Sequence, residues 1–196
     1  MSHVGIFLDR DGTINREVDY LRTPDELHLI DGSARAIAEL NSSGWRVIVM
    51  TNQSGIARGM LTEEDLSAIH KKLSDDLEKE GASLDAIYYC PHHPDYGGPK
   101  YQKDCDCRKP RTGMITRAVK EFGIDPKASF VVGDRMIDIQ TAINAGARSV
   151  LVLTGYGREE LELCRRNGVP VDHVADDLAG AVRHIRALRS EQHVNS

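Results

Sequence analysis

The stretch that decides the fold is VGIFLDRDGT, residues 4–13, in which a short apolar run stops at two aspartates. An apolar run of this length beside a turn signal is typical of a buried strand in a parallel sheet. Asp9 and Asp11 then lie at the carboxyl end of that strand, where open α/β sheets bind ligands. Because residues two apart on extended backbone point to the same side, both carboxylates can converge on one ligand while Arg10 faces away.

Two other interpretations of this stretch compete with a ligand site. Asp11-Gly12 is a hairpin-turn signal, but the residues that follow, INRE at 14–17, make a poor return strand. A calcium-binding EF-hand loop also opens with D-x-D, yet it requires Gly at its sixth position and Glu at its twelfth. Here Gly12 stands fourth and Tyr20 twelfth, which excludes the calcium loop. An incidental turn stays open until later segments are considered.

The length and charge of the chain limit the number of domains and the kinds of partner that we expect. Its 196 residues, with 25 basic and 30 acidic side chains, fit one domain with a sizeable core. We predict a single domain at residues 1–189 and a frayed tail at 190–196. The charge balance gives no electrostatic footprint for nucleic acid or anionic membrane, and no leader or membrane-spanning stretch is evident. We therefore expect a cytoplasmic protein with neither partner.

Apolar strand patterns alternate with amphipathic helix patterns along the chain. The strands are predicted at residues 4–8, 46–50, 86–89, 130–132, 150–153 and 173–175. Strict alternation predicts an α/β fold, a single doubly wound parallel sheet with helices on both faces and right-handed crossovers. In a strand order such as 3-2-1-4-5-6, the first and fourth strands are neighbours, and a ligand crevice lies between them.

Four carboxylates are expected around this crevice. Asp9 and Asp11 end the first strand, while Asp134 and Asp138 follow the fourth. Several like charges so close together call for a cation. Oxygen ligands alone suit Mg²⁺, which usually shares its coordination shell with a phosphate.

The neighbouring segments predict phosphoryl-transfer chemistry at this crevice. Thr51 and the backbone N–H groups of residues 52–55 follow the second strand, and Lys109 adds a positive charge before another helix. Asp9 is the candidate nucleophile, which would take a phosphoryl group as an acyl phosphate that water then hydrolyses. Asp11 would protonate the leaving oxygen and later deprotonate the water, with a pKa raised by burial and neighbouring negative charge.

Four motifs now carry a family resemblance. The segments DRDGT at 9–13, Thr51, Lys109 and GDRMID at 133–138 resemble, in order, the four motifs of the haloacid dehalogenase (HAD) superfamily. The similarity covers about residues 4–155. Within the superfamily the chain resembles phosphatases of the histidinol-phosphate phosphatase-like subgroup. The segments that carry this closer match are FLDRDG at 7–12, TNQSG at 51–55, CPHHP at 90–94 and CDCRKP at 105–110.

The resemblance implies a role for each matching residue. Mg²⁺ would be held by the Asp9 side chain, the Asp11 carbonyl and Asp134, while Thr51 and Lys109 steady the transferring phosphoryl group. Arg135 departs from the pattern, since such enzymes often have Lys there, and a planar guanidinium is not a compact ammonium. The implied substrate contacts are Glu17, Val18, Asp19, Tyr20, Asn52, Gln53, Ser54, Arg108 and Arg135.

Three cysteines and a histidine frame a loop rich in Pro and Gly at residues 90–107. Three sulfurs and one imidazole are a closed tetrahedral set suited to structural Zn²⁺. The alternative is reduced core cysteines beside a surface histidine. The loop has too few apolar residues to fold unaided, and zinc would hold it together. We therefore expect zinc to affect activity only by positioning this loop, which leads directly into Arg108 and Lys109. The predicted ligands are Cys90, His92, Cys105 and Cys107, with His93 as a loop histidine and Cys164 as a core thiol.

The spacing between motifs bears on the substrate. Between Asp11 and the second strand there is room for a loop and one helix only, and the zinc loop fills the space before Lys109, so we expect no cap domain. A compact sugar phosphate fits this arrangement, and Arg108 can clasp a second anionic group. The resemblance implies a monomer that hydrolyses the C7 phosphate of D-glycero-D-manno-heptose 1,7-bisphosphate, a precursor of nucleotide-activated heptose for lipopolysaccharide core or surface glycans.

Two alternative functions remain at this stage. The first is histidinol-phosphate hydrolysis, although the zinc loop of such enzymes is typically shorter than the one here. The second is a catalytically silent zinc-binding interaction protein, whose simplest signature would be the loss of Asp9, Asp11 or Asp134; all three are present. The preferred anomer of the bisphosphate and the nucleotide-heptose pathway stay open.

Overall fold

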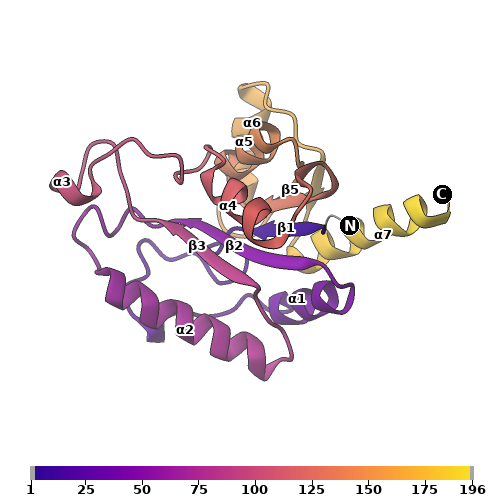
Figure 1. Ribbon diagram of the computed structural model, residues 1–196, viewed down its shortest axis with the longest axis horizontal. Helices are drawn as coiled ribbons and strands as arrows, with labels where there is room; N and C mark the ends of the chain where they lie inside the picture. Colours follow the sequence, from indigo (N-terminus) through magenta and orange to yellow (C-terminus); the bar gives the residue numbers. More distant parts are fainter. Residues whose placement is uncertain (1–2, 195–196) are drawn as a thin grey trace.

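The computed structural model describes residues 3–194, which form one six-stranded parallel sheet (Figure 1). The strand order is β3-β2-β1-β4-β5-β6, so the doubly wound order predicted from the sequence is confirmed. β1 pairs with β2 on one side and with β4 on the other. The strands are β1 (Gly5–Leu8), β2 (Arg46–Asn52), β3 (Ala86–Cys90), β4 (Phe130–Gly133), β5 (Arg148–Val152) and β6 (His173–Ala175).

Helices cover both faces of the sheet. One face carries α1 (Ser33–Ser42), α2 (Glu63–Lys79) and α7 (Leu178–Val194), and the other carries α4 (Gly113–Phe122), α5 (Met136–Ala145) and α6 (Gly157–Arg166). In Figure 1, α1 and α2 lie below the strands while α4, α5 and α6 lie above them. The connecting loops contain the one-turn helix α3 (Gly98–Tyr101) and the 3-10 turns η1 (Pro24–Glu26) and η2 (Pro126–Ala128).

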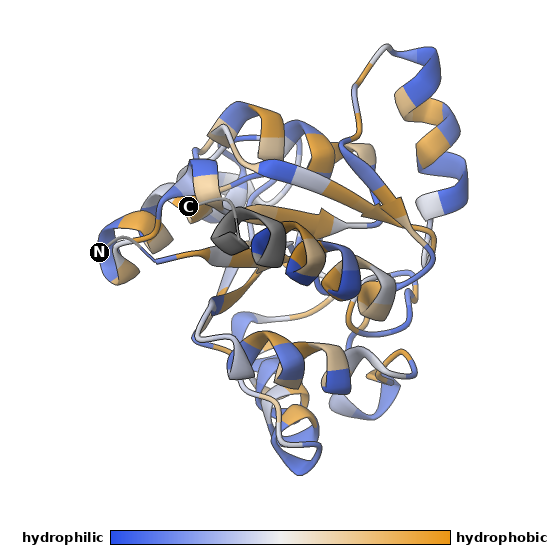
Figure 2. Ribbon diagram, turned by 90° about the vertical axis from the view of Figure 1, so that its right-hand side faces the viewer, coloured by the Kyte–Doolittle hydropathy of each residue, from blue (hydrophilic) through white to orange (hydrophobic). Residues whose placement is uncertain are grey.

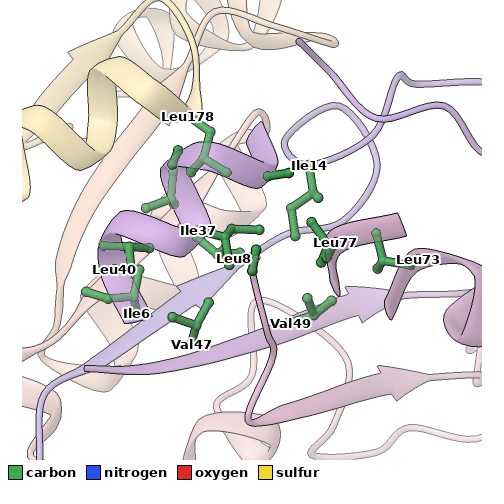
Figure 3. Packing of buried hydrophobic residues seen from close by; sticks show 14 of the residues in the cluster. Ile6, Leu8, Ile14, Ile37, Leu40, Val47, Val49, Leu73, Leu77 and Leu178 are labelled. Carbon is green, nitrogen blue, oxygen red and sulfur yellow. The ribbon is translucent and has the colours of Figure 1, made fainter. Parts of the chain in front are cut away.

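Alternating side chains of β1 pack into two separate cores. Ile6 and Leu8 are fully buried with Ile37 of α1 on one face (Figure 3), whereas Phe7 packs toward α4 on the other. Each buried side chain of this size contributes about 1.5–3 kcal/mol relative to an exposed one. β1 is therefore apolar on both of its sides, and much of the ribbon of the strands is orange in Figure 2.

The last helix differs from the sequence-based expectation. The backbone of residues 190–194, which the sequence assigns to a frayed tail, continues α7 as far as Val194. Residues 181–196 contain no Gly or Pro that would end the helix earlier. The rest of the expected tail, residues 195 and 196, lies outside the described residues. Within residues 3–194, no helix has both the length and the apolar composition that crossing a bilayer requires.

The connections around the site are short. Between β1 and β2 the chain forms η1 and α1, and between β3 and α4 it forms a loop that contains only α3. In the described part of the chain, neither connection holds a further folded domain. α3 lies at the far left of Figure 1, away from the helices that cover the sheet. The carboxyl edge of the sheet is therefore bordered by loops.

Candidate active site

The register of the sheet brings the polar strand ends together. Leu8 of β1 is aligned with Val49 of β2 and with Val132 of β4. Asp9 therefore leaves the sheet close to Thr51 and Asp134, although the three residues are far apart in the sequence. This convergence follows from parallel strands ending at one edge.

A pocket of about 240 Å³ opens at this edge. It contains every residue to which the sequence assigns a catalytic or substrate-binding role. Asp134, the one predicted magnesium ligand that does not line the pocket, is fully buried near Asp9. The predicted residues that line the pocket are Asp9, Asp11, Glu17, Val18, Asp19, Tyr20, Thr51, Asn52, Gln53, Ser54, Arg108, Lys109 and Arg135.

Three carboxylates and one lysine cluster at the pocket, which Asp9 and Lys109 line. We call Asp9, Asp134 and Asp138 the carboxylate group; one oxygen of each lies within 4.8 Å of the others. Lys109 Nζ lies 3.0 Å from Asp9 Oδ1 and 2.6 Å from Asp138 Oδ1. Burial opposes the charge on Lys109, but Asp138 and Asp9 outweigh it and raise the lysine pKa above its usual range. One cation thus faces three buried acids.

This imbalance fits a further cation. Burial raises the pKa of Asp134 to about 8, and the carboxylates of Asp9 and Asp138 add to the shift. Burial likewise raises the pKa of Asp9 to about 6, although Lys109 opposes it. Asp134 Oδ2 accepts a hydrogen bond from the Tyr156 amide at 2.9 Å, whereas its buried Oδ1 has no partner. An unpaired buried carboxylate oxygen among like charges is what a hard cation would satisfy.

Two glycines let the chain approach Asp134 closely. A Cβ on Gly12 would lie 2.1 Å from Asp134 Oδ2, and one on Gly155 would lie 2.2 Å from the same oxygen. Both residues have positive φ, which favours glycine. No larger residue fits at either position without displacing the carboxylate.

Asp11 faces a different set of partners from Asp9. Both of its oxygens accept from Arg10 Nη2, at 2.9 and 2.7 Å, and Asn15 and Gln53 donate to it at 2.9 and 3.0 Å. Burial acts to raise the pKa of Asp11, but Arg10 and these hydrogen bonds outweigh it and lower the pKa. The sequence-based expectation of a raised pKa is therefore wrong for this free form, because Arg10 turns back onto its neighbour.

Arg10 itself is fully buried and does not line the pocket. Its Nη1 lies 3.2 Å from Nε2 of His70 on α2. Burial, together with the Arg10 charge, lowers the pKa of His70 to about 3, so the imidazole is neutral and accepts from the guanidinium. Asp11 is therefore tied to α2 through Arg10.

The two amides after Thr51 hold other site residues in place. The Asn52 side chain accepts from the Lys109 amide at 3.0 Å and donates to the Lys109 carbonyl at 3.2 Å. Gln53 Nε2 donates to Asp11 and, at 2.9 Å, to Thr51 Oγ1. Both residues line the pocket as predicted, but these amides are engaged by the protein itself.

The predicted zinc ligands also come together. We call Cys90, His92, Cys105 and Cys107 the cysteine group; their ligand atoms lie within 4.8 Å of one another. The three Sγ–Sγ distances are 3.2, 3.2 and 3.5 Å, and Cys107 Sγ lies 3.3 Å from His92 Nδ1. These spacings exclude disulfides and approach the edges, about 3.7 Å, of a tetrahedron around zinc. His93 lies outside the group, with Nε2 3.3 Å from Arg58 Nη2.

The cysteine group is joined to the pocket through Arg108. This residue follows Cys107 directly, and its Nη1 donates to the His92 carbonyl at 3.1 Å. On the opposite side, the Glu63 carboxylate accepts from the hydroxyls of Tyr89 and Tyr101, which fixes the loop against the start of α2. The loop and Arg108 therefore form one connected unit.

Some site residues had no role in the sequence-based prediction. Asp138 was placed near the crevice by its D-x-x-x-D spacing, and it proves to hold Lys109 while its Oδ2 accepts from the Arg135 amide. Tyr156 lines the pocket from the loop after β5, where position at a strand end was the only available signal. The other lining residues without a predicted role are Leu21 and Ile137, whereas Gly55 belongs to residues 52–55, whose backbone N–H groups were predicted at this site.

The doubly wound fold and the carboxylate group at the edge of its sheet are features of one class of hydrolase, and comparisons with known proteins agree. Residues 106–181, which include Lys109 and the Asp134–Asp138 pair, match the family model described as HAD-hydrolase-like. A crystal structure of the D,D-heptose 1,7-bisphosphate phosphatase from B. bronchiseptica, complexed with magnesium and phosphate, superimposes with a TM-score of 0.84. It is 38% identical in sequence, and the match covers 94% of this chain and 98% of that one.

Similar relatives carry a consistent name. The D-glycero-D-manno-heptose-1,7-bisphosphate 7-phosphatase of Chlorobaculum tepidum is 42% identical over 183 residues, 90% of this chain and 91% of the relative. The D-glycero-beta-D-manno-heptose-1,7-bisphosphate 7-phosphatase of Pasteurella multocida is 45% identical over 186 residues, 94% and 98% of the two chains. The chain therefore belongs to the family of HAD-like hydrolases that contains these bisphosphate phosphatases.

Proposed function

We propose that this enzyme hydrolyses the C7 phosphate of D-glycero-D-manno-heptose 1,7-bisphosphate and releases heptose 1-phosphate and phosphate. The observation that carries the proposal is that Asp9 lines one pocket of about 240 Å³ together with the cations of Lys109, Arg108 and Arg135. The relatives' names supply the substrate. Two anionic groups on one small sugar match a pocket lined by three cations.

Asp9 acts as the nucleophile. Its Oδ1 is fixed by Lys109 Nζ and by the Arg10 amide, which donates at 2.8 Å. A carboxylate oxygen of Asp9 forms a bond to phosphorus while the bond between phosphorus and the C7 oxygen breaks. Water then attacks the phosphorus of the resulting acyl phosphate, which returns the carboxylate and releases phosphate. Lys109 and Thr51 hold the phosphoryl oxygens during both steps.

Asp11 acts as the acid and then the base. In the free protein Arg10 keeps it ionised, and the phosphate that binds next to it adds negative charge, which raises its pKa toward the protonated form. The protonated carboxyl gives its proton to the C7 oxygen as that bond breaks. The carboxylate then takes a proton from the attacking water. Gln53 and Asn15 keep this side chain turned toward the pocket throughout.

A magnesium ion fits the carboxylate group. The proposed ligands are the Asp9 side chain, the Asp11 backbone carbonyl and Asp134, whose Oδ1 lacks a partner. When bound, Mg²⁺ neutralises phosphate charge and offsets the repulsion between an anionic nucleophile and an anionic substrate. Asp138 is already engaged by Lys109 and the Arg135 amide, so its part is to hold the lysine.

The cysteine group would hold a structural Zn²⁺ in this proposal. Its four side chains would supply the four ligands of a closed structural site, so the ion would take no part in the chemistry. Its effect on turnover would be indirect: the bound His92 holds Arg108 through its carbonyl, and Arg108 binds the second anionic group of the sugar. We further infer one phosphatase domain at residues 1–189 that works as a cytoplasmic monomer.

A phosphate-release assay tests the proposed function. Purified enzyme with Mg²⁺ is offered both anomers of heptose 1,7-bisphosphate and, separately, histidinol phosphate, and the products are analysed for the position of the remaining phosphate. We expect heptose 1-phosphate and a higher kcat/KM for the bisphosphate. A preference for histidinol phosphate, or loss of the C1 phosphate, would contradict the proposal. The two anomers also decide whether the preference named for the Pasteurella multocida relative holds here.

A further inference from the structure

Tyr156 makes three separate contacts at the pocket. Its amide donates to Asp134 Oδ2 at 2.9 Å, and its hydroxyl lies 3.2 Å from Asp19 Oδ1. The guanidinium carbon of Arg135 lies 4.3 Å from the centre of its ring, within the range of a cation–π interaction. Tyr156 thereby contacts Asp134 of the carboxylate group and two residues that line the pocket, Asp19 and Arg135.

The position of Tyr156 is fixed by close backbone packing on either side. Gly155 lies directly against Asp134 and Gly12, and a Cβ on Gly157 would lie 1.8 Å from the Val152 carbonyl oxygen. Thr154 Oγ1 donates to the Gly12 carbonyl at 2.6 Å. The loop after β5 therefore packs closely against the turn at Gly12, and this packing fixes the backbone from which the Tyr156 ring extends to the pocket.

The segment that Tyr156 reaches, residues 17–21, packs into the core at Leu21 and against it at Val18, but it makes few hydrogen bonds. Among residues 3–194, the Tyr156 hydroxyl provides the only hydrogen bond that joins residues 17–21 to a distant part of the chain. Asp19 and Tyr20 are exposed, and Tyr20 has the left-handed backbone φ of 51° that non-glycine residues rarely adopt. The exposed residues Asp19 and Tyr20 therefore depend on the Tyr156 hydrogen bond, and their conformation should loosen when it is removed.

The ring contact explains how an arginine is accommodated at position 135. A guanidinium is planar and stacks on an aromatic face, which an ammonium does less well. Arg135 is exposed at the pocket mouth, where its long side chain would otherwise sample several rotamers. Stacking on Tyr156 holds the charge on the substrate side.

We propose that Tyr156 is a positioning residue that sets substrate specificity, because it holds Arg135 and the 17–21 segment in the geometry that grips the sugar. The proposal rests on the proposed function in that the ligand is a phosphorylated sugar with several hydroxyls. Tyr156 acts through its neighbours. Its side chain therefore governs the binding of the sugar more than the transfer of the phosphoryl group.

The test compares Tyr156→Ala, which removes ring and hydroxyl, with Tyr156→Phe, which removes the hydroxyl only. Tyr96→Ala is the matched control, since the Tyr96 ring stacks on Arg58 at 4.2 Å but lies outside the pocket. Steady-state kinetics are measured with heptose 1,7-bisphosphate and with p-nitrophenyl phosphate, whose aryl group carries no hydroxyls for the 17–21 segment. The rate of chymotryptic cleavage after Tyr20 in the folded protein and the thermal unfolding are measured on the same samples.

We expect Tyr156→Ala to raise KM for the bisphosphate about tenfold and Tyr156→Phe about threefold. The loss on p-nitrophenyl phosphate should be several times smaller, and cleavage after Tyr20 should be faster in both variants but not in Tyr96→Ala. Equal losses on the two substrates, an unchanged KM or an unchanged cleavage rate would overturn the proposal. If the unmodified enzyme does not hydrolyse the bisphosphate, the proposed function fails, and the cleavage rate alone then decides the role of Tyr156.

Discussion

The carboxylate group and the cysteine group are both able to hold a metal ion, but they are built in opposite ways. The carboxylate group stands on the ends of β1 and β4 and the first turn of α5, is buried, and leaves Asp134 Oδ1 without a partner. The cysteine group frames a loop and offers four side-chain ligands. An unbalanced, partly open site on a rigid sheet suits chemistry, whereas a closed site on a loop suits scaffolding.

The first way to break this comparison is Asp9→Asn. If the carboxylate group is the chemical site, phosphate release should fall by at least about 10³-fold, because the amide cannot form the acyl phosphate. The zinc content, measured by metal analysis, should stay the same as in the unmodified protein. A variant that keeps turnover, or that loses zinc along with it, would remove the distinction between the two groups.

The second test replaces the one cation that the carboxylate group already has. Lys109→Met leaves Asp9 and Asp138 buried without their shared partner, so the free energy of unfolding in magnesium-free buffer should fall by about 3–5 kcal/mol. Urea denaturation measures this change. Lys103→Met, on the exposed part of the zinc loop, is the control and should change stability by less than about 0.5 kcal/mol. Equal effects of the two substitutions would show that the carboxylates do not depend on Lys109.

The third test removes one predicted zinc ligand from the cysteine group. Cys107→Ser should lose the bound zinc, destabilise the protein by about 3 kcal/mol and increase amide exchange over residues 91–107, because zinc binding contributes to the folding of this loop. KM for the bisphosphate should rise as Arg108 loses its anchor. Cys164→Ser, which alters a lone buried thiol far from the group, controls for the loss of a cysteine. Full activity with an ordered loop after zinc removal would contradict the scaffolding role.

The smallest effect concerns pH and Glu17, a pocket residue that belongs to neither group. Burial, and then the Asp11 carboxylate, raise the Glu17 pKa from its ordinary value of 4.5 to about 7. The folded state therefore holds this proton more tightly, and the stabilisation is full below pH 4.5 and is lost as the pH rises to about 7.

Glu17→Gln should accordingly leave stability at pH 4.5 nearly unchanged and increase it at pH 8, so that the profile becomes flatter between these values. Urea unfolding at both pH values measures the difference, with Glu78→Gln on the exposed end of α2 as the control. A parallel shift at both pH values would show that the Glu17 proton is not linked to folding.

Local patterns in the sequence were sufficient to predict the fold and the residues of both groups that could hold a metal ion. Asp9 and Asp134 each follow an apolar strand, and the spacing of Cys90, His92, Cys105 and Cys107 is short enough to imply one loop. Parallel strands then bring the acidic ends together, whatever the details of the loops between them. The strand order confirmed this part of the prediction.

Interactions between distant side chains could not be predicted in the same way. Arg10 turns back to Asp11 because His70, 60 residues later, supports its guanidinium. The side-chain amide of Asn52 is hydrogen-bonded to the backbone of Lys109, 57 residues away, and the Tyr156 hydroxyl to Asp19, 137 residues away. Such contacts depend on rotamers and packing, which leave no periodic signal in the chain. The pKa of Asp11 was mispredicted for the same reason.

The most direct test of the account is to trap the covalent intermediate. Enzyme mixed with ³²P-labelled heptose bisphosphate is quenched in acid within one turnover, digested and mapped by mass spectrometry. We predict a labelled phosphoryl group on the peptide that contains Asp9, absent from the Asp9→Asn variant. Label on another residue, or single-turnover hydrolysis that never places label on Asp9, would contradict the claim that this carboxylate attacks phosphorus.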